Sequence, residues 1–170
     1  MSSPTKVPWD RAPHTAAKHD LYRYYMDAWF PILIQRFGEV TVAEGFAGPG
    51  IYSQGEPGSP IIALQSFKRS SAYRQCRRAR FIFVDHTKAC IDMLRGEVAK
   101  ELGHYLDTDY DDGRMRVLVR RGRCESILTG LLADEGAWDK PVLALLDSYG
   151  GAVPASMLTE FGSRQRAEVI

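Results

Sequence analysis

The sequence predicts an α/β fold: a doubly wound, mainly parallel sheet of the Rossmann-like class, preceded by an N-terminal helix. Short apolar runs alternate with stretches of helical length along the 170 residues. The runs are apolar at nearly every position, as in strands buried on both faces of a parallel sheet. The connecting stretches are long enough for the helical crossovers that parallel strands need.

The chain is expected to have two parts, an N-terminal arm and helix over residues 1–38 and a cofactor-binding domain over residues 39–170. An apolar run that begins at Ala167 indicates the start of a fifth strand. A domain of this type normally continues beyond such a strand, so the domain is expected to be incomplete at its C-terminus.

The N-terminal part combines an extended segment with a long helix. Prolines at positions 4, 8 and 13 indicate an extended arm, and a helix is expected over residues 15–37. Pro31 is expected to kink or split this helix because proline lacks the backbone N–H, and Gly38 is expected to end it. The apolar face of the helix is expected to hold Leu21, Tyr25, Ala28 or Trp29, and Ile32, which fall at helical spacing.

Four strands are expected before the fifth, over residues 40–44, 80–84, 115–119 and 142–146, and a helix is expected after each. Ser59 is expected to cap the first of these helices, with Pro60 at its first helical position, and Thr87 is expected to cap the second. The acidic tract 107–113 is expected to be a loop.

The stretch V-T-V-A-E-G-F-A-G-P-G, residues 40–50, joins the first strand to a glycine-rich turn. Gly45, Gly48 and Gly50 let the backbone turn sharply and approach a ligand. Glu44 ends the strand, at the edge where open α/β sheets bind ligands. A carboxylate there suits a hydroxyl-rich or cationic ligand and repels a pyrophosphate. The stretch therefore indicates a nucleoside-type cofactor pocket, and a purely structural turn is the alternative.

Acidic residues follow three of the strands, and in a parallel sheet Glu44, Asp85 and Asp147 would share one edge. Asp85 is placed to accept hydrogen bonds from ribose hydroxyls or, alternatively, to cap the next helix. Asp147 could accept a hydrogen bond from an exocyclic amine, and Tyr149 could stack on a flat ring beside it. A polar turn is the alternative for this last segment.

The composition, 45% hydrophobic and 25% charged, is ordinary for a globular domain. No apolar run approaches the roughly 20 residues of a membrane span, and the N-terminus lacks the apolar core of a signal peptide. A cytoplasmic protein without membrane contact is therefore expected. Cys76, Cys90 and Cys124 fit neither a disulfide framework nor a zinc pattern, so no metal site is expected.

The net charge of +1 gives no general reason to expect a polyanionic partner, but residues 68–80 and 114–123 are locally basic. These two segments could meet the phosphates of RNA or DNA, or they could be solvated, salt-bridged faces. Lys18 and His19 form a further polar pair on the first helix. This pair either reaches a substrate over the cleft or lies on a solvated helix face.

Taken together, these motifs resemble the three-Cys-motif partner family, bacterial proteins described as methyltransferase-like. The resemblance covers nearly the whole chain, although family members are generally longer. More distantly, the layout resembles the ribosomal RNA adenine methyltransferases. The matching segments are the Lys18-His19 helix with Tyr24, Tyr25 and Trp29, E-G-F-A-G-P-G-I-Y at 44–52, G-S-P at 58–60, and D-S-Y-G at 147–150.

The resemblance implies the class I methyltransferase fold with S-adenosylmethionine as its cofactor. It also implies a separate partner protein that carries a three-cysteine motif. By this resemblance the glycine turn would hold the methionine part of the cofactor and Asp85 the ribose. The implied residues are Glu44, Gly45, Phe46, Gly48, Gly50, Asp85 and Gly122 for the cofactor, Lys18, Asp147 and Tyr149 for catalysis, and His19, Tyr52 and Ser148 for the substrate.

Two positions depart from the family pattern. Ser148 replaces the proline of an Asp-Pro-aromatic-Gly turn, which leaves the backbone freer. The segment 121–124 carries arginines where the family often has Asp or Asn to bind the adenine amine, and Glu125 is the nearest carboxylate. Arginines at these positions suit a phosphorylated ligand better than they suit the adenine amine.

The leading hypothesis is a methyltransferase that uses S-adenosylmethionine and acts on an amine of a nucleobase in RNA or DNA. The main alternative is a catalytically inactive, methyltransferase-like module that binds partners in a multi-protein assembly, which the two departures favour. A nucleoside- or nucleotide-processing enzyme on the same fold is a third possibility. A hydrolase with a serine nucleophile is poorly supported, because no G-x-S-x-G motif occurs.

Overall fold

A computed structural model of the chain describes residues 6–106, 109–148 and 153–170. It contains a six-stranded sheet with the order β3-β4-β2-β1-β5-β6, in which only β3 runs antiparallel to its neighbour. The strands are β1 (Glu39–Glu44), β2 (Arg78–Asp85), β3 (Tyr110–Asp111), β4 (Met115–Arg121), β5 (Val142–Leu145) and β6 (Ala167–Val169).

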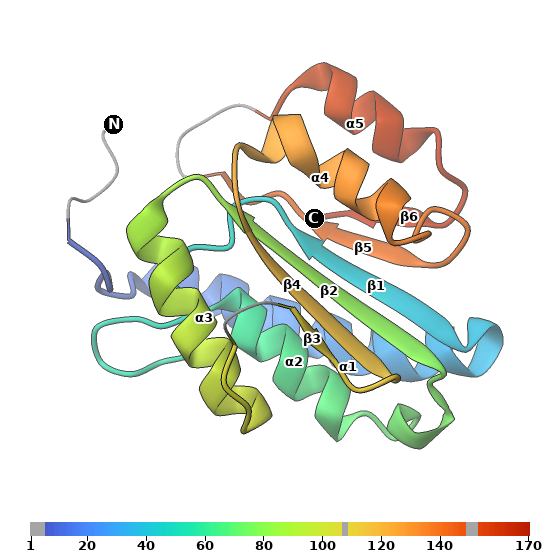
Figure 1. The fold of residues 1–170 in the computed structure, drawn as a ribbon, viewed down its shortest axis with the longest axis horizontal. Coiled ribbons are helices and arrows are strands. Elements are labelled where there is room, and N and C mark those ends of the chain that lie inside the picture. Colours follow the sequence, from blue (N-terminus) through green and yellow to red (C-terminus); the bar gives the residue numbers. More distant parts are fainter. Residues whose placement is uncertain (1–5, 107–108, 149–152) are drawn as a thin grey trace.

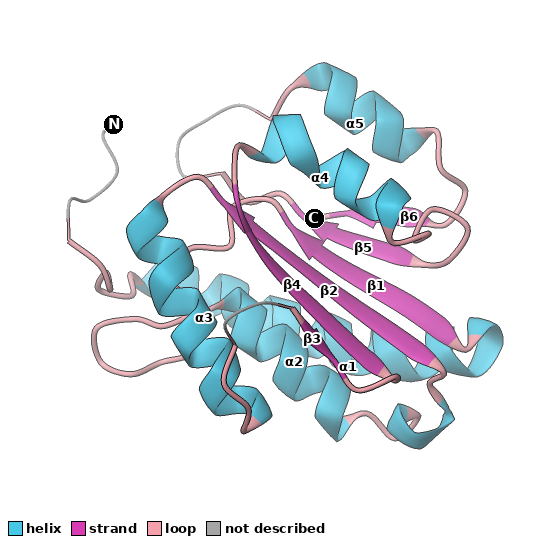
Figure 2. Ribbon diagram, viewed as in Figure 1, coloured by secondary structure: helices cyan, strands magenta, loops and turns pink. Residues whose placement is uncertain are grey.

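Helices cover both faces of this sheet, as the sequence predicts for a doubly wound fold (Figure 1). One face carries α1 (Pro13–Phe37), α2 (Ser59–Arg69) and α3 (Lys88–Leu102), and the other carries α4 (Cys124–Asp134) and α5 (Ala155–Gly162). A short 3-10 helix, η1 (Tyr73–Gln75), precedes β2. The strand order reverses at β1, which lies between β2 and β5 (Figure 2). Ligands of open α/β sheets bind at such a reversal, beside the carboxyl ends of the strands.

Two apolar cores hold the layers together. The larger core lies under α1, α2 and α3, where Phe30 and Phe67 pack edge-on at 5.5 Å between ring centroids. The smaller core lies under α4 and α5 around Leu128, Leu132 and Phe161. Helix α1 therefore packs on the same sheet as the rest of the fold, because its buried side chains belong to the larger core.

The long N-terminal helix does not split at Pro31, because helix α1 is continuous through this residue. The predicted apolar face was wrong at Leu21 and Ile32, which are each 61% exposed, and is confirmed at Trp29, which is buried. Apolar residues occur all around this helix, so spacing alone does not identify the face that packs. The residues that are buried are His19, Tyr22, Met26, Trp29, Phe30 and Ile34.

The continuity of α1 has a packing explanation. A proline inside a helix removes one hydrogen bond and costs about 3 kcal/mol or more. Phe30 and Ile34, on either side of Pro31, are both buried in the larger core. Burying two such side chains yields about 1.5–3 kcal/mol each, which is enough to offset the loss.

Three smaller local predictions also differ from the structure. Part of the expected acidic loop forms β3, because Tyr110 and Asp111 pair with the edge of β4. Ser59 is the first residue of α2 and Gly58 takes the capping position. Thr87 does precede α3, but its side chain makes no capping hydrogen bond. The Ser59 hydroxyl donates to Glu44, and the backbone N–H of Thr87 donates to Asp85.

Candidate functional site

The three strand-terminal carboxylates lie at one edge of the sheet, as predicted. Glu44 is the last residue of β1 and is level with Phe83 of β2 and Leu145 of β5. Asp85 and Asp147 each lie two residues beyond those partners. Because β1, β2 and β5 are mutually parallel neighbours, their carboxyl ends meet at the point where the strand order reverses.

Glu44 forms the floor of this edge. Its side chain is only 2% exposed, and its Oε2 accepts a hydrogen bond of 2.7 Å from the Ser59 hydroxyl. This bond explains why Ser59 does not cap α2. Oε1 of Glu44 is buried and has no hydrogen-bond partner within the described part of the chain. Burial, with a smaller contribution from the negative charge of Asp147, raises the pKa of Glu44 to about 8.

Asp85 joins the glycine-rich turn to the start of α3. One carboxylate oxygen accepts the backbone N–H of Gly48 at 3.0 Å, and the other accepts the backbone N–H of Thr87 at 2.8 Å. Asp85 does not cap α3 as the alternative expected, because the N–H that it accepts belongs to Thr87, which precedes the first helical residue. Each oxygen keeps a second lone pair, so ribose binding stays a prediction that this geometry permits.

The glycines of the turn make room mainly for the protein's own side chains. A Cβ on Gly45 would lie 2.2 Å from the Cys124 sulfur, and one on Gly50 would lie 2.6 Å from Leu94. Gly48 has φ +64°, a conformation that favours glycine. The remaining predicted cofactor residues belong to the same layer: Phe46 packs on the α4–α5 core, and a Cβ on Gly122 would meet Ile127 at 2.5 Å.

The N-terminal half of α1 brings the predicted residue Lys18 to this edge, together with Tyr22, which was not predicted. The Lys18 ammonium forms an ion pair of 2.7 Å with Oδ2 of Asp147, and the Tyr22 hydroxyl lies 3.5 Å from the same oxygen. The carboxylate of Asp147 is 47% exposed, so it also faces solvent. The Lys18–Asp147 contact connects α1 to the segment after β5, which is where the sequence predicts the substrate.

His19 lies inside this constellation. It is buried, its ring centroid is 5.4 Å from that of Tyr52, and its Nδ1 has no hydrogen-bond partner within the described residues. Burial and the positive charge of Arg11 lower the pKa of His19 to about 4, so the ring is neutral near pH 7. Burial and the nearby carboxylates raise the pKa of Tyr52 to about 12.

The predicted substrate residue Ser148 and the predicted catalytic residue Tyr149 follow β5 in the sequence. Ser148 is half-buried, and its backbone N–H donates to the Leu146 carbonyl at 3.0 Å. Tyr149 lies outside the described residues, so its predicted stacking role stays a prediction.

The N-terminal arm lies over the glycine-rich loop, which the sequence analysis did not anticipate. The Trp9 carbonyl accepts the Ser53 N–H at 2.8 Å, and the Trp9 ring lies 3.5 Å from the position of a Cβ on Gly48. Arg11 pairs with Glu56 at 3.5 Å. The only feature of the sequence that could have indicated this contact is the tryptophan in the proline-rich arm. Tyr22 was also missed, although it follows Lys18 at a spacing of four, which places both on one helix face.

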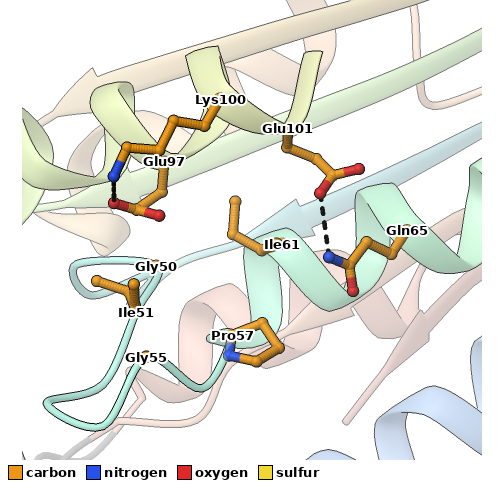
Figure 3. Close-up of a pocket in the computed structure, with 9 residues that line it drawn as sticks. All are labelled: Gly50, Ile51, Gly55, Pro57, Ile61, Gln65, Glu97, Lys100 and Glu101. Carbon is orange, nitrogen blue, oxygen red and sulfur yellow. Dashed lines mark hydrogen bonds and ion pairs between the residues drawn. The ribbon is translucent and has the colours of Figure 1, made fainter. Parts of the chain in front are cut away.

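A cavity of about 250 Å³ opens elsewhere, between the loop after β1 and helices α2 and α3 (Figure 3). None of the three strand-terminal carboxylates lines it. Its charged walls are already satisfied, since Lys100 pairs with Glu97 at 2.6 Å and Gln65 donates to Glu101 at 3.0 Å. The candidate site is therefore the carboxylate edge, where buried polar atoms lack partners.

No helix in the described part of the chain is long and apolar enough to cross a membrane. The described residues also contain no group of three or more His, Cys, Asp or Glu side chains that could hold a metal ion. Comparison with family models, curated proteins and solved structures found no match to this chain.

Proposed function

We propose that this protein is a methyltransferase that uses S-adenosylmethionine and acts on an amine of a nucleobase. The observation that carries the proposal is the buried Glu44 carboxyl at the strand-order reversal, with one oxygen that lacks a partner among the described residues. A buried polar atom without a partner is costly, so a ligand that satisfies it gains affinity.

The residues at the edge fit the polar groups of this cofactor. Glu44 would accept the ammonium of the methionine part, and the free lone pairs of Asp85 would accept ribose hydroxyls. Bound there, the cofactor supplies an electrophilic methyl group on a sulfonium sulfur. Both acidic residues match a ligand that is cationic and rich in hydroxyls. They would repel the negative charge of a pyrophosphate ligand.

The other side chains would position the substrate. Asp147 would accept an N–H of the amine and direct the nitrogen lone pair at the methyl carbon, while Lys18 holds the carboxylate in place. Asp147 would also be placed to accept the proton that the amine nitrogen loses when it gains the methyl group. Orientation supplies most of the acceleration, because this transfer needs little acid–base assistance.

Calorimetry with S-adenosylhomocysteine tests the cofactor part of this proposal. Because free Glu44 has a raised pKa of about 8, it is largely protonated at pH 7. Pairing with the ligand's ammonium favours the carboxylate, so binding should release a proton. Titrations in buffers of different ionisation enthalpy should detect that release in the wild type and not in Glu44→Gln.

Glu97→Gln is the matched control, because Glu97 is an ion-paired glutamate on α3, on the cavity away from the carboxylate edge. It should bind the ligand like the wild type, whereas Glu44→Gln should bind at least about tenfold more weakly. A folded wild-type protein that binds no S-adenosylhomocysteine would contradict the proposed function.

A second function, a methyltransferase-like binding module, is favoured by a different observation. Leu21, Tyr25 and Ile32 form an exposed apolar stripe along α1, each at least 36% exposed. The Tyr25 hydroxyl contacts Glu168 of β6, so the stripe borders that edge strand. Within the described residues β6 pairs only with β5, which leaves its other edge free to add a strand from a partner chain.

Affinity purification distinguishes this second function from the first. Leu21→Arg with Ile32→Arg should release a partner that binds through the stripe, whereas Leu158→Arg, at an exposed leucine on α5, should retain it. The binding-module function also requires that the wild type transfers no methyl group to RNA or DNA. A partner that both variants retain would remove the stripe from this role.

A further inference from the structure

We propose that a strip of arginines at the edge opposite the carboxylates binds the phosphate backbone of a nucleic-acid strand. We name Arg36, Arg74, Arg77, Arg114 and Arg166 the basic strip. Arg77, Arg114 and Arg166 each directly precede a strand, and Arg36 lies three residues before β1. The strip therefore follows the edge where β1, β2, β4 and β6 begin. It does not depend on the proposed methyl transfer.

Phe37 contacts three members of the basic strip, Arg36, Arg77 and Arg166. The guanidinium carbons of Arg36 and Arg166 lie 5.3 Å and 5.1 Å from the centre of the Phe37 ring. Arg77 donates a hydrogen bond of 3.1 Å to the Phe37 carbonyl. Arg166 also donates from Nη1 to the Asp139 carbonyl at 2.7 Å. A guanidinium held on a ring face keeps its remaining N–H groups available to a phosphate.

The other end of the strip is an open groove of about 630 Å³, which Arg74, Arg77 and Arg114 line together. The guanidinium of Arg114 lies 5.1 Å from the centre of the Tyr73 ring, and its Nε donates to the Cys76 carbonyl at 3.2 Å. Three of the five arginines thus lie over an aromatic ring, Arg36 and Arg166 over Phe37 and Arg114 over Tyr73. This combination is typical of surfaces that bind a nucleic-acid strand.

Ion pairing separates the basic strip from the other arginines of the sheet. Arg78, Arg80, Arg116 and Arg120 each pair with a carboxylate at 3.0 Å or less. Within the described ranges no member of the strip forms such a pair. The groove does contain one acid, Asp112, but its side chain accepts the backbone N–H groups of Arg114 and Met115 and so holds the turn before β4. Asp112 offsets one positive charge in the groove, and the three arginines that line it leave a net positive charge.

Ion pairing divides each of the two basic segments of the sequence, 68–80 and 114–123, into paired residues and members of the strip. Arg116, Arg120 and Arg123 of the second segment are neutralised by Glu135, Asp109 and Glu125. Arg74 and Arg77 of the first segment join Arg114 and two arginines from distant parts of the chain. A net charge of +1 conceals this local excess, because acidic side chains elsewhere balance it.

Fluorescence anisotropy with labelled single-stranded RNA and DNA of mixed sequence tests the proposal. Arg36→Glu with Arg74→Glu changes two exposed residues of the strip, and Arg36→Gln with Arg74→Gln is the milder version. Each neutralised contact should lower the slope of log affinity against log salt by about 0.7, so the glutamine pair should lower it by about 1.4. We expect the glutamate pair to bind at least about tenfold more weakly.

Lys88→Glu with Lys100→Glu is the charge-matched control on α3. Each exchange removes two units of charge, so both glutamate pairs change the net charge of +1 by −4, to −3. Lys88 and Lys100 are 70% and 72% exposed and are paired with Asp92 and Glu97. Equal weakening in the control, or wild-type protein that binds neither nucleic acid at 50 mM salt, would overturn the proposal. Competition by poly-glutamate as strong as that by RNA would assign the strip to an acidic protein instead.

Discussion

Lys18 and Asp147 are 129 positions apart in the chain, and their side chains meet in an ion pair of 2.7 Å. The pair joins the first helix to the segment after β5, across the edge where Glu44 and Asp85 also end their strands. It is part-exposed on both sides, and such pairs contribute only about 0–1 kcal/mol to stability. We therefore expect the Lys18–Asp147 pair to position the substrate rather than to stabilise the fold.

Asp147→Asn should abolish most methyl transfer while leaving the fold intact. The amide keeps the size of the side chain but loses the charge that orients the amine, so turnover should fall about 10²-fold or more. Affinity for S-adenosylhomocysteine should stay within a few-fold of the wild type. Asp20→Asn, which removes another exposed carboxylate of a Lys/Arg pair, should leave turnover unchanged. Wild-type turnover in Asp147→Asn would exclude this residue from catalysis.

The stability of the free protein should fall as the pH rises from about 5 to 8, through Glu44. Burial raises the folded-state pKa of Glu44 from 4.5 to about 8, so in this window the folded state holds a proton that the unfolded state has released. The contribution of Glu44 is thus fully present below pH 4.5 and is lost through pH 8, on the order of 5 kcal/mol. Denaturant titrations of the wild type and Glu44→Gln at several pH values measure it.

The wild type must be compared with Glu44→Gln because His19 also makes stability depend on pH, with a slope of the opposite sign. Its lowered pKa of about 4 means that stability rises with pH between about 4 and 6.5. Both proteins contain His19, so the difference between their pH profiles isolates Glu44. Parallel profiles for the wild type and Glu44→Gln would show that Glu44 ionises normally in the folded protein.

Gly45→Ala should destabilise the fold by about 1–3 kcal/mol, the usual range for overpacking a core. The added Cβ would lie 2.2 Å from the sulfur of Cys124 and 3.1 Å from Leu146. Cys124→Ala in the same chain should restore part of the loss, because it removes the closest atom. Gly130→Ala is the control: nothing lies within 4 Å of its Cβ, so it should stabilise α4 by about 0.5–1 kcal/mol. Urea titration measures all three.

The three cysteines should resist thiol reagents until the protein unfolds. All three are buried, and burial raises the pKa of Cys90 to about 11 and that of Cys124 to about 12. Only the thiolate reacts, so labelling at pH 8 should be slow in buffer and rapid in denaturant. Rapid modification of Cys124 in the folded protein would mean that α4 opens away from the glycine-rich turn.

The parallel strands and the edge that collects Glu44, Asp85 and Asp147 follow from local sequence, whereas β3 does not. An apolar run that ends in a carboxylate predicts both a buried strand and the residue at its carboxyl end. Right-handed crossovers then leave few ways to arrange the parallel strands in a sheet. The resemblance to methyltransferase-like proteins, and the cofactor and substrate it implies, stay predictions for the experiments above.

Tertiary structure decided which side of α1 is buried and which charges find partners. Helix α1 carries apolar residues on several sides, so only the shape of the sheet beneath it selects Tyr22 and Met26 over Leu21 and Ile32. Likewise, Asp109 and Glu135 neutralise Arg120 and Arg116, whereas Arg74 and Arg77 end without a carboxylate partner among the described residues. Periodicity is a property of neighbouring residues, but burial and ion pairing depend on side chains that are distant in sequence and adjacent only after folding.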